Sequence, residues 1–289
     1  MQQERHPATA VGLEFLKNLS KELNTQEIDL PPFPDTYARI LQTLQDPDLS
    51  MIQLGRVVTT APDLCVKILR MANSVILNRS GIEVTDVNVA VARLGADAVR
   101  NATVALATSV AFTIPAGSPY KQKLDQLREV SVSTAAHAHT LAIIRKLTEL
   151  KDDALLTGLL HNVGAFYMLS RLDRYPEFAN DEVIQAWNPG IGYAIIQNWG
   201  FPEPLAKAVE QQDLRPSAPP ETPGLRELLV VSLELARSAH LPLEVAQERL
   251  AERREMEPAF ELTGVLPHRL EHLRADMRDG VSEFIHALK

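Results

Sequence analysis

A seven-residue segment, Gly158-Leu159-Leu160-His161-Asn162-Val163-Gly164, sets a histidine beside an asparagine in apolar surroundings. A histidine followed by an aspartate can bind metal through both side chains, because the carboxylate supplies the anionic oxygen that hard cations need. Asparagine offers only a neutral carbonyl oxygen, which cannot replace a charged ligand that bridges two cations. This position therefore decides whether the surrounding fold can carry a metal centre.

Composition indicates a soluble globular protein. The 289 residues are 45% hydrophobic and 23% charged, which is ordinary for a chain that buries a large core. The net charge of −8, from 29 basic and 37 acidic residues, argues against a protein that coats nucleic acid. No apolar run approaches the roughly 20 residues of a membrane-spanning helix. A single cysteine, Cys65, and an N-terminus without a signal-peptide pattern predict a cytoplasmic location.

The apolar periodicity is helical almost throughout, and no strand-length run alternates cleanly. Apolar residues recur at helical spacing in Leu16-Leu19-Leu23, Tyr37-Ile40-Leu41-Leu44 and Cys65-Ile68-Leu69-Ala72-Ile76. Ser50 opens a capping-box signature that begins a helix at Met51. Gly95 ends a helix that begins after Thr85 or Asp86. The predicted fold class is all-α.

Two proline-rich segments, 114–119 and 216–224, divide the chain. The first separates an N-terminal helical subdomain, 25–115, from a second helical subdomain, 120–289, which carries His161. A further helix is predicted within 1–24. The second proline-rich segment is a surface loop, after which amphipathic helices are predicted at about 225–239, 243–256 and 266–288.

Several segments together resemble one family, the HDOD domain (HD-related output domain). They are Leu30-Pro31-Pro32-Phe33-Pro34, Leu69-Arg70-Met71-Ala72-Asn73-Ser74, Val91-Ala92-Arg93-Leu94-Gly95 followed by Arg100-Asn101, the segment 158–164, and Asn198-Trp199-Gly200-Phe201-Pro202. The resemblance runs from about Leu30 onward. It implies an N-terminal helical subdomain packed on a degenerate form of the HD phosphohydrolase subdomain. It also implies a bacterial signalling module that acts through protein contacts.

The resemblance allows the ligands of a catalytic HD enzyme to be sought along the chain. A first histidine belongs on the helix before the His-Asp pair, but Val130, Ser131 and Val132 stand around that spacing. Asn188 occupies the place of a histidine at the start of the helix before W-G-F-P. After W-G-F-P, where catalytic relatives carry one or two histidines, this chain has Gln211-Gln212-Asp213.

Only His161 remains, and a site with one histidine cannot hold a di-metal centre. We therefore expect no catalytic residue, no metal and no cofactor, and we treat His161, Asn162 and Asn188 as vestigial positions. His161 is predicted to be a buried histidine bonded to Asn162 or to the backbone, and Asn162 a structural amide.

A second polar cluster lies in the N-terminal half. Its members are Arg70, Asn73, Ser74, Arg93 and Arg100. In the structural interpretation, which we favour, Asn73 and Ser74 cap a helix C-terminus and Arg93 or Arg100 binds carbonyl groups there. In the functional interpretation the same residues hold an acidic partner or a phosphate ligand.

The resulting prediction is a non-catalytic signalling regulator or scaffold. It would bind a protein partner of a two-component or cyclic-di-GMP pathway, the contexts that the resemblance implies. The partner would lie in the groove between subdomains or on the N-terminal half. One alternative is a metal-dependent phosphohydrolase or phosphodiesterase in which His161 converges with Asp152, Asp153 or Asp213. The other is a nucleotide sensor that uses a cavity around His161, Asn162 and Asn188.

Overall fold

The computed structural model describes residues 33–74, 78, 82–115, 117–216 and 220–288. All the regular structure in this part of the chain is helical, so the prediction of an all-α fold is confirmed. The helix predicted within 1–24 lies outside the described residues. No helix in the described part of the chain is long and apolar enough to cross a membrane.

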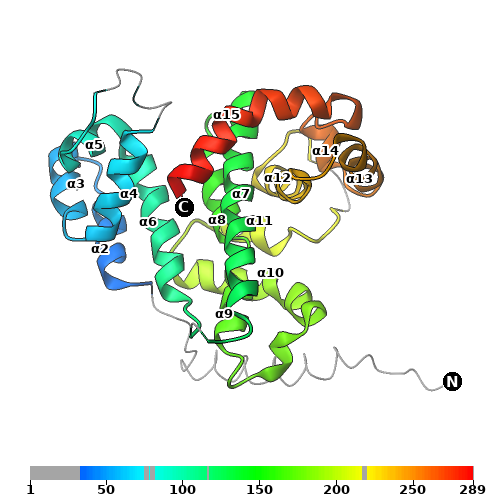
Figure 1. Ribbon diagram of the computed structural model, residues 1–289, viewed down its shortest axis with the longest axis horizontal. Helices are drawn as coiled ribbons and strands as arrows, with labels where there is room; N and C mark the ends of the chain where they lie inside the picture. Colours follow the sequence, from blue (N-terminus) through cyan, green and yellow to red (C-terminus); the bar gives the residue numbers. More distant parts are fainter. Residues whose placement is uncertain (1–32, 75–77, 79–81, 116, 217–219, 289) are drawn as a thin grey trace.

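The N-terminal helices form one unit with its own core (Figure 1). They are α2 (Asp35–Thr43), α3 (Met51–Val58), α4 (Pro62–Ala72), α5 (Val87–Leu94) and α6 (Ala96–Ala111). α5 packs against both α3 and α4, and α6 packs against α2 and α4. Fully buried Ile40, Leu54, Leu64 and Ile68 fill the space between them.

The central helices surround the segment that opened the sequence analysis. They are α7 (Lys121–Ile144), α8 (Lys151–Leu160), α9 (Val163–Ser170), the 3-10 turn η1 (Pro176–Ala179), α10 (Asp181–Asn198) and α11 (Glu203–Glu210). α8 lies along α7, while α10 contacts both α9 and α11. Val104 and Phe112, from α6 and its end, belong to this central core rather than to the N-terminal one. Because α6 contributes to both cores, the division near residue 115 stays a prediction.

The last part of the chain covers the other side of α7. It comprises α12 (Leu225–Ser238), α13 (Leu243–Met256), α14 (Ala259–Leu262), the 3-10 turn η2 (Pro267–Arg269) and α15 (Leu270–Leu288). The three helices predicted here are confirmed to within a few residues. α15, orange to red in Figure 1, crosses α7 and reaches α4 of the N-terminal unit.

Local capping chemistry explains where several helices begin and end. The Ser50 side chain accepts a hydrogen bond from the Gln53 N–H, and the Gln53 side chain accepts one from the Ser50 N–H, so the predicted capping box is confirmed. Asp86 caps α5, and Gly95 follows its last residue with φ 82°, a conformation that glycine adopts without strain.

The Trp199-Gly200-Phe201 segment ends α10 and ties the two halves together. Gly200, at φ 76°, donates to the Gln197 carbonyl, while Phe201 donates to the Ile196 carbonyl. This pair of bonds is a Schellman motif, which requires the left-handed residue that Gly200 provides. The turn exposes the Trp199 ring to Phe33, 5.1 Å away between ring centroids, and to Phe112 at 5.8 Å. Aromatic packing at one helix end thus joins segments from three parts of the chain.

Gly158 sets the distance between α7 and α8. A Cβ atom added there would lie 2.4 Å from Ala135 Cα and 2.6 Å from Ala135 N, both backbone atoms that cannot rotate away. The absence of a side chain therefore lets α8 approach α7 closely enough for the two backbones to touch. α7 and α8 make the most extensive helix–helix contact among the described elements.

We predict that Gly158→Ala lowers the free energy of unfolding by about 3 kcal/mol, because the added methyl group must push two buried helices apart. Gly190→Ala is the matched control, since a Cβ at this α10 position meets nothing within 4 Å. The control should be neutral or stabilising by up to about 1 kcal/mol, since alanine has the higher helix propensity. Urea denaturation of both variants provides the measurement. Equal stability of the two would contradict the close-contact argument.

Candidate functional site

His161 lies at a break between two helices. α8 ends at Leu160, and α9 begins at Val163 with Asn162 as its N-cap. His161 is 1% exposed, and its Nδ1 lies 2.7 Å from the Gly158 carbonyl oxygen. Because a carbonyl can only accept, Nδ1 carries the proton and Nε2 is left as a buried lone pair without a hydrogen-bond partner. The predicted bond from a buried His161 to the backbone is confirmed.

Burial also keeps the His161 imidazole neutral. Removal from water lowers its pKa to about 4, and the positive charge of Arg237 acts in the same direction. The bond to Gly158 opposes this shift but does not overcome it. A neutral imidazole with Nδ1–H bound to a carbonyl and Nε2 unprotonated is the form in which histidine binds metals. His161 thus retains the geometry of a ligand.

Asn162 differs in this respect, because its amide is used within the protein. Its Nδ2 donates to Ser131 Oγ at 3.2 Å and to the Leu127 carbonyl at 3.4 Å, both on α7. Ser131 is one of the residues at the spacing of a first histidine in a catalytic relative. The structure therefore brings these two positions together as a hydroxyl and an amide. These bonds agree with the prediction that Asn162 is a structural amide, and the sequence does not indicate that Ser131 is its partner.

Asn188 completes the helix break. In an uninterrupted helix the Ala165 N–H would donate to the His161 carbonyl. Here the Asn188 amide stands between them: Oδ1 accepts from Ala165 N at 2.9 Å, and Nδ2 donates to His161 O at 3.0 Å. One side-chain amide therefore satisfies both the N–H and the carbonyl that a continuous helix would have joined to each other.

The expected position of Asn188 at a helix start was wrong. α10 begins seven residues earlier at Asp181, after Asn180, whose side chain caps the Glu182 N–H. Pro189 suggests a helix start in the sequence, because proline fits a first turn. It lies instead inside α10. The preceding cap at Asn180 was the overlooked signal.

Gln212 is a further residue of the site that the sequence did not single out. Its Nε2 donates to the His161 carbonyl at 3.2 Å, beside the bond from Asn188. The side chain is 7% exposed and follows the end of α11. The Gln211-Gln212-Asp213 segment was noted only because it lacks histidine. The Gln212 amide nevertheless bonds to the His161 carbonyl at the helix break, and it comes from a fourth segment of the chain.

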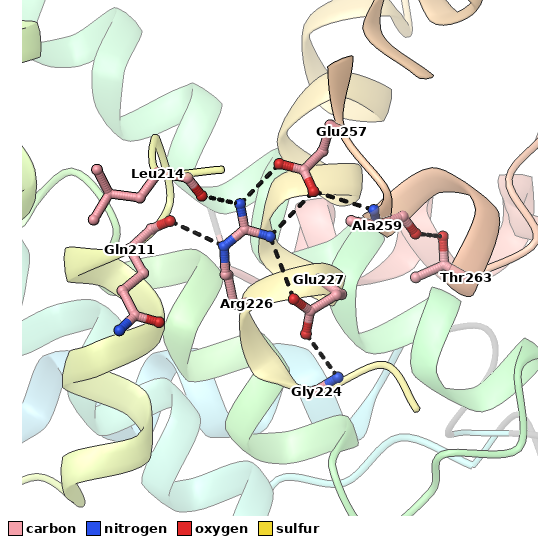
Figure 2. Close-up of polar contacts among 8 residues, drawn as sticks. All are labelled: Gln211, Leu214, Gly224, Arg226, Glu227, Glu257, Ala259 and Thr263. Atoms are coloured by element: carbon pink, nitrogen blue, oxygen red, sulfur yellow. Dashed lines mark hydrogen bonds and ion pairs between the residues drawn. The ribbon is translucent and has the colours of Figure 1, made fainter. Parts of the chain in front are cut away.

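Arg226 binds two backbone carbonyl groups of the segment that carries Gln212 (Figure 2). Its guanidinium donates to the Gln211 carbonyl at 3.0 Å and to the Leu214 carbonyl, one on each side of Gln212. The same group is paired with Glu257 at 2.8 Å and with Glu227 at 3.3 Å. Glu227 in turn accepts from the Gly224 N–H at the start of α12. A buried arginine with all its charge neutralised thus anchors the loop that supplies Gln212.

The polar side chains around His161 do not fit a di-metal centre. Ser131, Asn162, Asn188 and Gln212 are neutral, and the three amides already donate hydrogen bonds within the site. Among the described residues no group of three or more His, Cys, Asp or Glu side chains is arranged to hold a metal ion. Hard divalent cations need anionic oxygen ligands, and the site offers none.

The three aspartates of the phosphohydrolase alternative have other neighbours. Asp152 accepts from Lys151 at 2.6 Å and lies 3.9 Å from His139. The pKa of Asp153 is raised by burial and by neighbouring acids, although Arg100 opposes the shift. Burial likewise raises the pKa of Asp213, which faces arginines 237, 253 and 226. Each of these carboxylates therefore lies near a different set of basic side chains.

The N-terminal polar cluster divides into separate roles. Asn73 bonds the backbone of Val84 through both amide atoms, at 2.7 Å each, and Arg93 donates to the Ala72 carbonyl at 3.2 Å. These contacts agree with the structural interpretation. Buried Ser74 lies just after α4, and exposed Arg70 lies in its last turn. Partner binding by these residues stays a prediction.

Arg100 lines a groove between the N-terminal unit and the central helices. It pairs with Asp97 at 3.4 Å and is partly exposed. The groove has a volume of about 460 Å³ and is walled mainly by apolar groups. Its lining comes from α2, from Asp153 and Leu156 on α8, and from the 199–202 turn. The sequence analysis predicts a partner site in a groove between subdomains, and this groove is a candidate for it.

The fold and site define an all-helical protein whose central site is lined by neutral polar side chains. The chain matches the HDOD domain over residues 30–214, and it belongs to that family. The predicted resemblance is confirmed.

Solved structures support the same fold. A protein described as a candidate metal-dependent phosphohydrolase of Shewanella amazonensis SB2B is 20% identical, with a TM-score of 0.75 over 97% of this chain and 100% of that one. A protein described as a candidate signal transduction protein of Marinobacter aquaeolei VT8 is 21% identical, with a TM-score of 0.57 over 98% of this chain and 67% of that one. At these identities the likeness establishes the fold alone.

A sequence relative of greater length also exists. An uncharacterized protein of Treponema pallidum (strain Nichols) is 23% identical over 212 residues. The match spans 67% of this chain but only 39% of that protein. The relative therefore contains much more than the part shared with this chain.

We predict that Asn188→Ala lowers the free energy of unfolding by about 2 kcal/mol, because the buried Ala165 N–H loses its acceptor. Asn198→Ala, an exposed change near the end of the same helix, should stay within about 0.5 kcal/mol of the wild type. Urea denaturation compares the two. A similar small effect of both changes would show that the amide bridge contributes nothing.

We also predict an acid-sensitive contribution from Glu257. Burial alone would raise its pKa, but bonds from Arg226 and the Ala259 N–H outweigh burial and hold the pKa below its usual value. A depressed carboxyl pKa stabilises the fold above the unfolded-state value, near 4.3, and this contribution is lost as the pH falls through the folded-state value. Glu257→Gln should therefore cost stability at pH 7, with a smaller cost below about pH 4.

The matched control for this measurement is Glu255→Gln, an exposed change on the same turn of chain. Urea denaturation at several pH values from 7 to about 3 gives the profile of each protein. A difference between wild type and Glu257→Gln that does not vary with pH would contradict the assignment.

Proposed function

We propose that this protein is a non-catalytic regulator of bacterial signal transduction that acts by binding a protein partner. The observation that carries the proposal is the set of neutral side chains at the former ligand positions, which bond to groups within the protein, above all Asn162 bound to Ser131. These groups stabilise a helix junction and leave no anionic ligand for a catalytic metal. Membership of the HDOD family supports a signalling role.

The groove beside Arg100 is the proposed partner site. Its apolar walls, from Phe33 and Leu41 to Phe201, provide surface whose burial favours association. Arg100 and Asp153 provide charged groups at its edge that can select a complementary partner. A partner bound here would touch both subdomains and so respond to their relative position. A cytoplasmic partner from a two-component or cyclic-di-GMP pathway remains part of this proposal.

The test combines partner capture with metal and activity measurements. Tagged wild type, Arg100→Glu and Ala38→Trp, both within the groove, are used to capture proteins from cells that express the chain naturally. Arg56→Glu on exposed α3 is the control. Binding of each captured protein is then measured with purified components by calorimetry. We expect one partner whose affinity falls at least tenfold in both groove variants and is unchanged in the control, corresponding to about 1.4 kcal/mol.

Elemental analysis and a phosphodiesterase assay with added Mn²⁺ test the alternative enzyme. Stoichiometric metal with turnover that His161→Ala abolishes would overturn the non-catalytic assignment. A partner that binds all the groove variants equally would instead overturn the assignment of the groove. A thermal-shift screen with nucleotides tests the sensor alternative, because a ligand that binds only the folded state raises its stability.

A further inference from the structure

A second cleft lies between α12 and α15, with residues of α7 at its base. Its volume is about 450 Å³, within the range of small-molecule sites. The walls are mainly aliphatic: Leu235, Leu273, Met277, Val281 and Ile285. The cleft shares no lining residue with the groove beside Arg100. An occupant of this cleft would therefore contact none of the residues that line the groove.

His137 provides a fixed hydrogen-bond acceptor at the base of the cleft. Its Nδ1 lies 2.8 Å from the Ser133 carbonyl oxygen, which can only accept, so Nδ1 carries the proton. Burial, together with the charge of Arg274, lowers the pKa of His137, although the bond to Ser133 opposes this. The imidazole is therefore neutral, and Nε2 presents a lone pair. No side chain or backbone group of the described residues donates to this lone pair.

The two arginines at the cleft are in different situations. Arg274 donates to the Ser238 carbonyl at 2.6 Å and to the Leu241 carbonyl at 3.2 Å, where it completes the C-terminus of α12. Arg278, one turn further along α15, is exposed and has no hydrogen bond or ion pair with any described residue. Arg274 thus has a structural task, whereas the charge of Arg278 remains available to a ligand.

We propose that this cleft binds a small amphipathic organic anion, with an aliphatic body, a carboxylate and a hydroxyl or N–H group. The aliphatic body would cover Leu273, Met277 and Val281, where it is removed from water. The carboxylate would pair with Arg278, and the hydroxyl or N–H would donate to His137 Nε2. Each of the three parts of the ligand is matched by a separate feature of the cleft, so each can be tested alone.

The experiment is calorimetric titration of the whole chain with three related compounds. 3-Hydroxydecanoate carries all three features, decanoate lacks the hydroxyl, and 1,3-decanediol lacks the charge. We expect 3-hydroxydecanoate to bind most tightly, at one molecule per chain. Loss of the hydroxyl should weaken binding roughly three- to tenfold, as expected for one buried neutral hydrogen bond. Loss of the charge should weaken it by up to about fivefold, as expected for a partly exposed ion pair.

Variants locate the site. Arg278→Gln should remove the advantage of 3-hydroxydecanoate over the diol, and His137→Leu should remove its advantage over decanoate. Arg56→Gln, on exposed α3 of the N-terminal unit, should bind like the wild type. Arg278 is exposed, so its replacement leaves the fold intact, and circular dichroism checks the folding of His137→Leu. Absence of saturable binding, or equal affinities in wild type and both cleft variants, would overturn the proposal without affecting the partner groove.

Discussion

The amide of Asn188 is the constraint on which the centre of this structure depends. It bonds to both the His161 carbonyl and the Ala165 N–H, which a continuous helix would join directly. The chain can therefore break between α8 and α9 without leaving either group unpaired. A backbone break in a buried region leaves a donor and an acceptor that must both be satisfied. An amide has an acceptor and a donor on two separate atoms in a fixed orientation, whereas a carboxylate has no donor and a hydroxyl offers both from a single oxygen. The backbones of α9 and α10 also approach each other closely at this point. Gly164 permits this approach, because a Cβ there would lie 2.3 Å from the Asn188 carbonyl oxygen.

The same argument about hydrogen-bond donors and acceptors applies to Asn162. Its amide donates to the Leu127 carbonyl and to Ser131. An aspartate of the same shape would turn a carboxylate oxygen toward that carbonyl, and its buried charge would have no cation to offset the loss of water. Asparagine keeps the volume and reverses the polarity of the contact. The structural requirement is therefore met without the ligand chemistry, and His161 keeps a ligand-like geometry only because Gly158 orients it.

The parts of the fold that the sequence predicted well depend on neighbours along the chain. The cap at Ser50 and the helix end at Gly95 involve bonds across three or four residues, so local pattern determines them. Asn188, Gln212 and Arg226 depend on contacts across many residues, and no local spacing indicates them. The error over the start of α10 has another origin: the family resemblance placed Asn188 at a helix start, whereas the local signal for that start is the cap at Asn180.

The two proposed binding sites lie at seams between helices, outside the central hydrogen-bond network. The Asn188 and Gln212 amides both bond to the backbone at the α8–α9 junction, so they cannot exchange those bonds for a ligand without breaking that junction. Polar groups at the seams are less committed: Arg100 borders the groove between subdomains, and Arg278 borders the cleft beside α15. α15 touches both α7 and α4, so an occupant that shifts α15 acts on a helix that reaches the N-terminal unit. The placement of both clefts outside the central network is consistent with the proposed function, in which the protein binds partners.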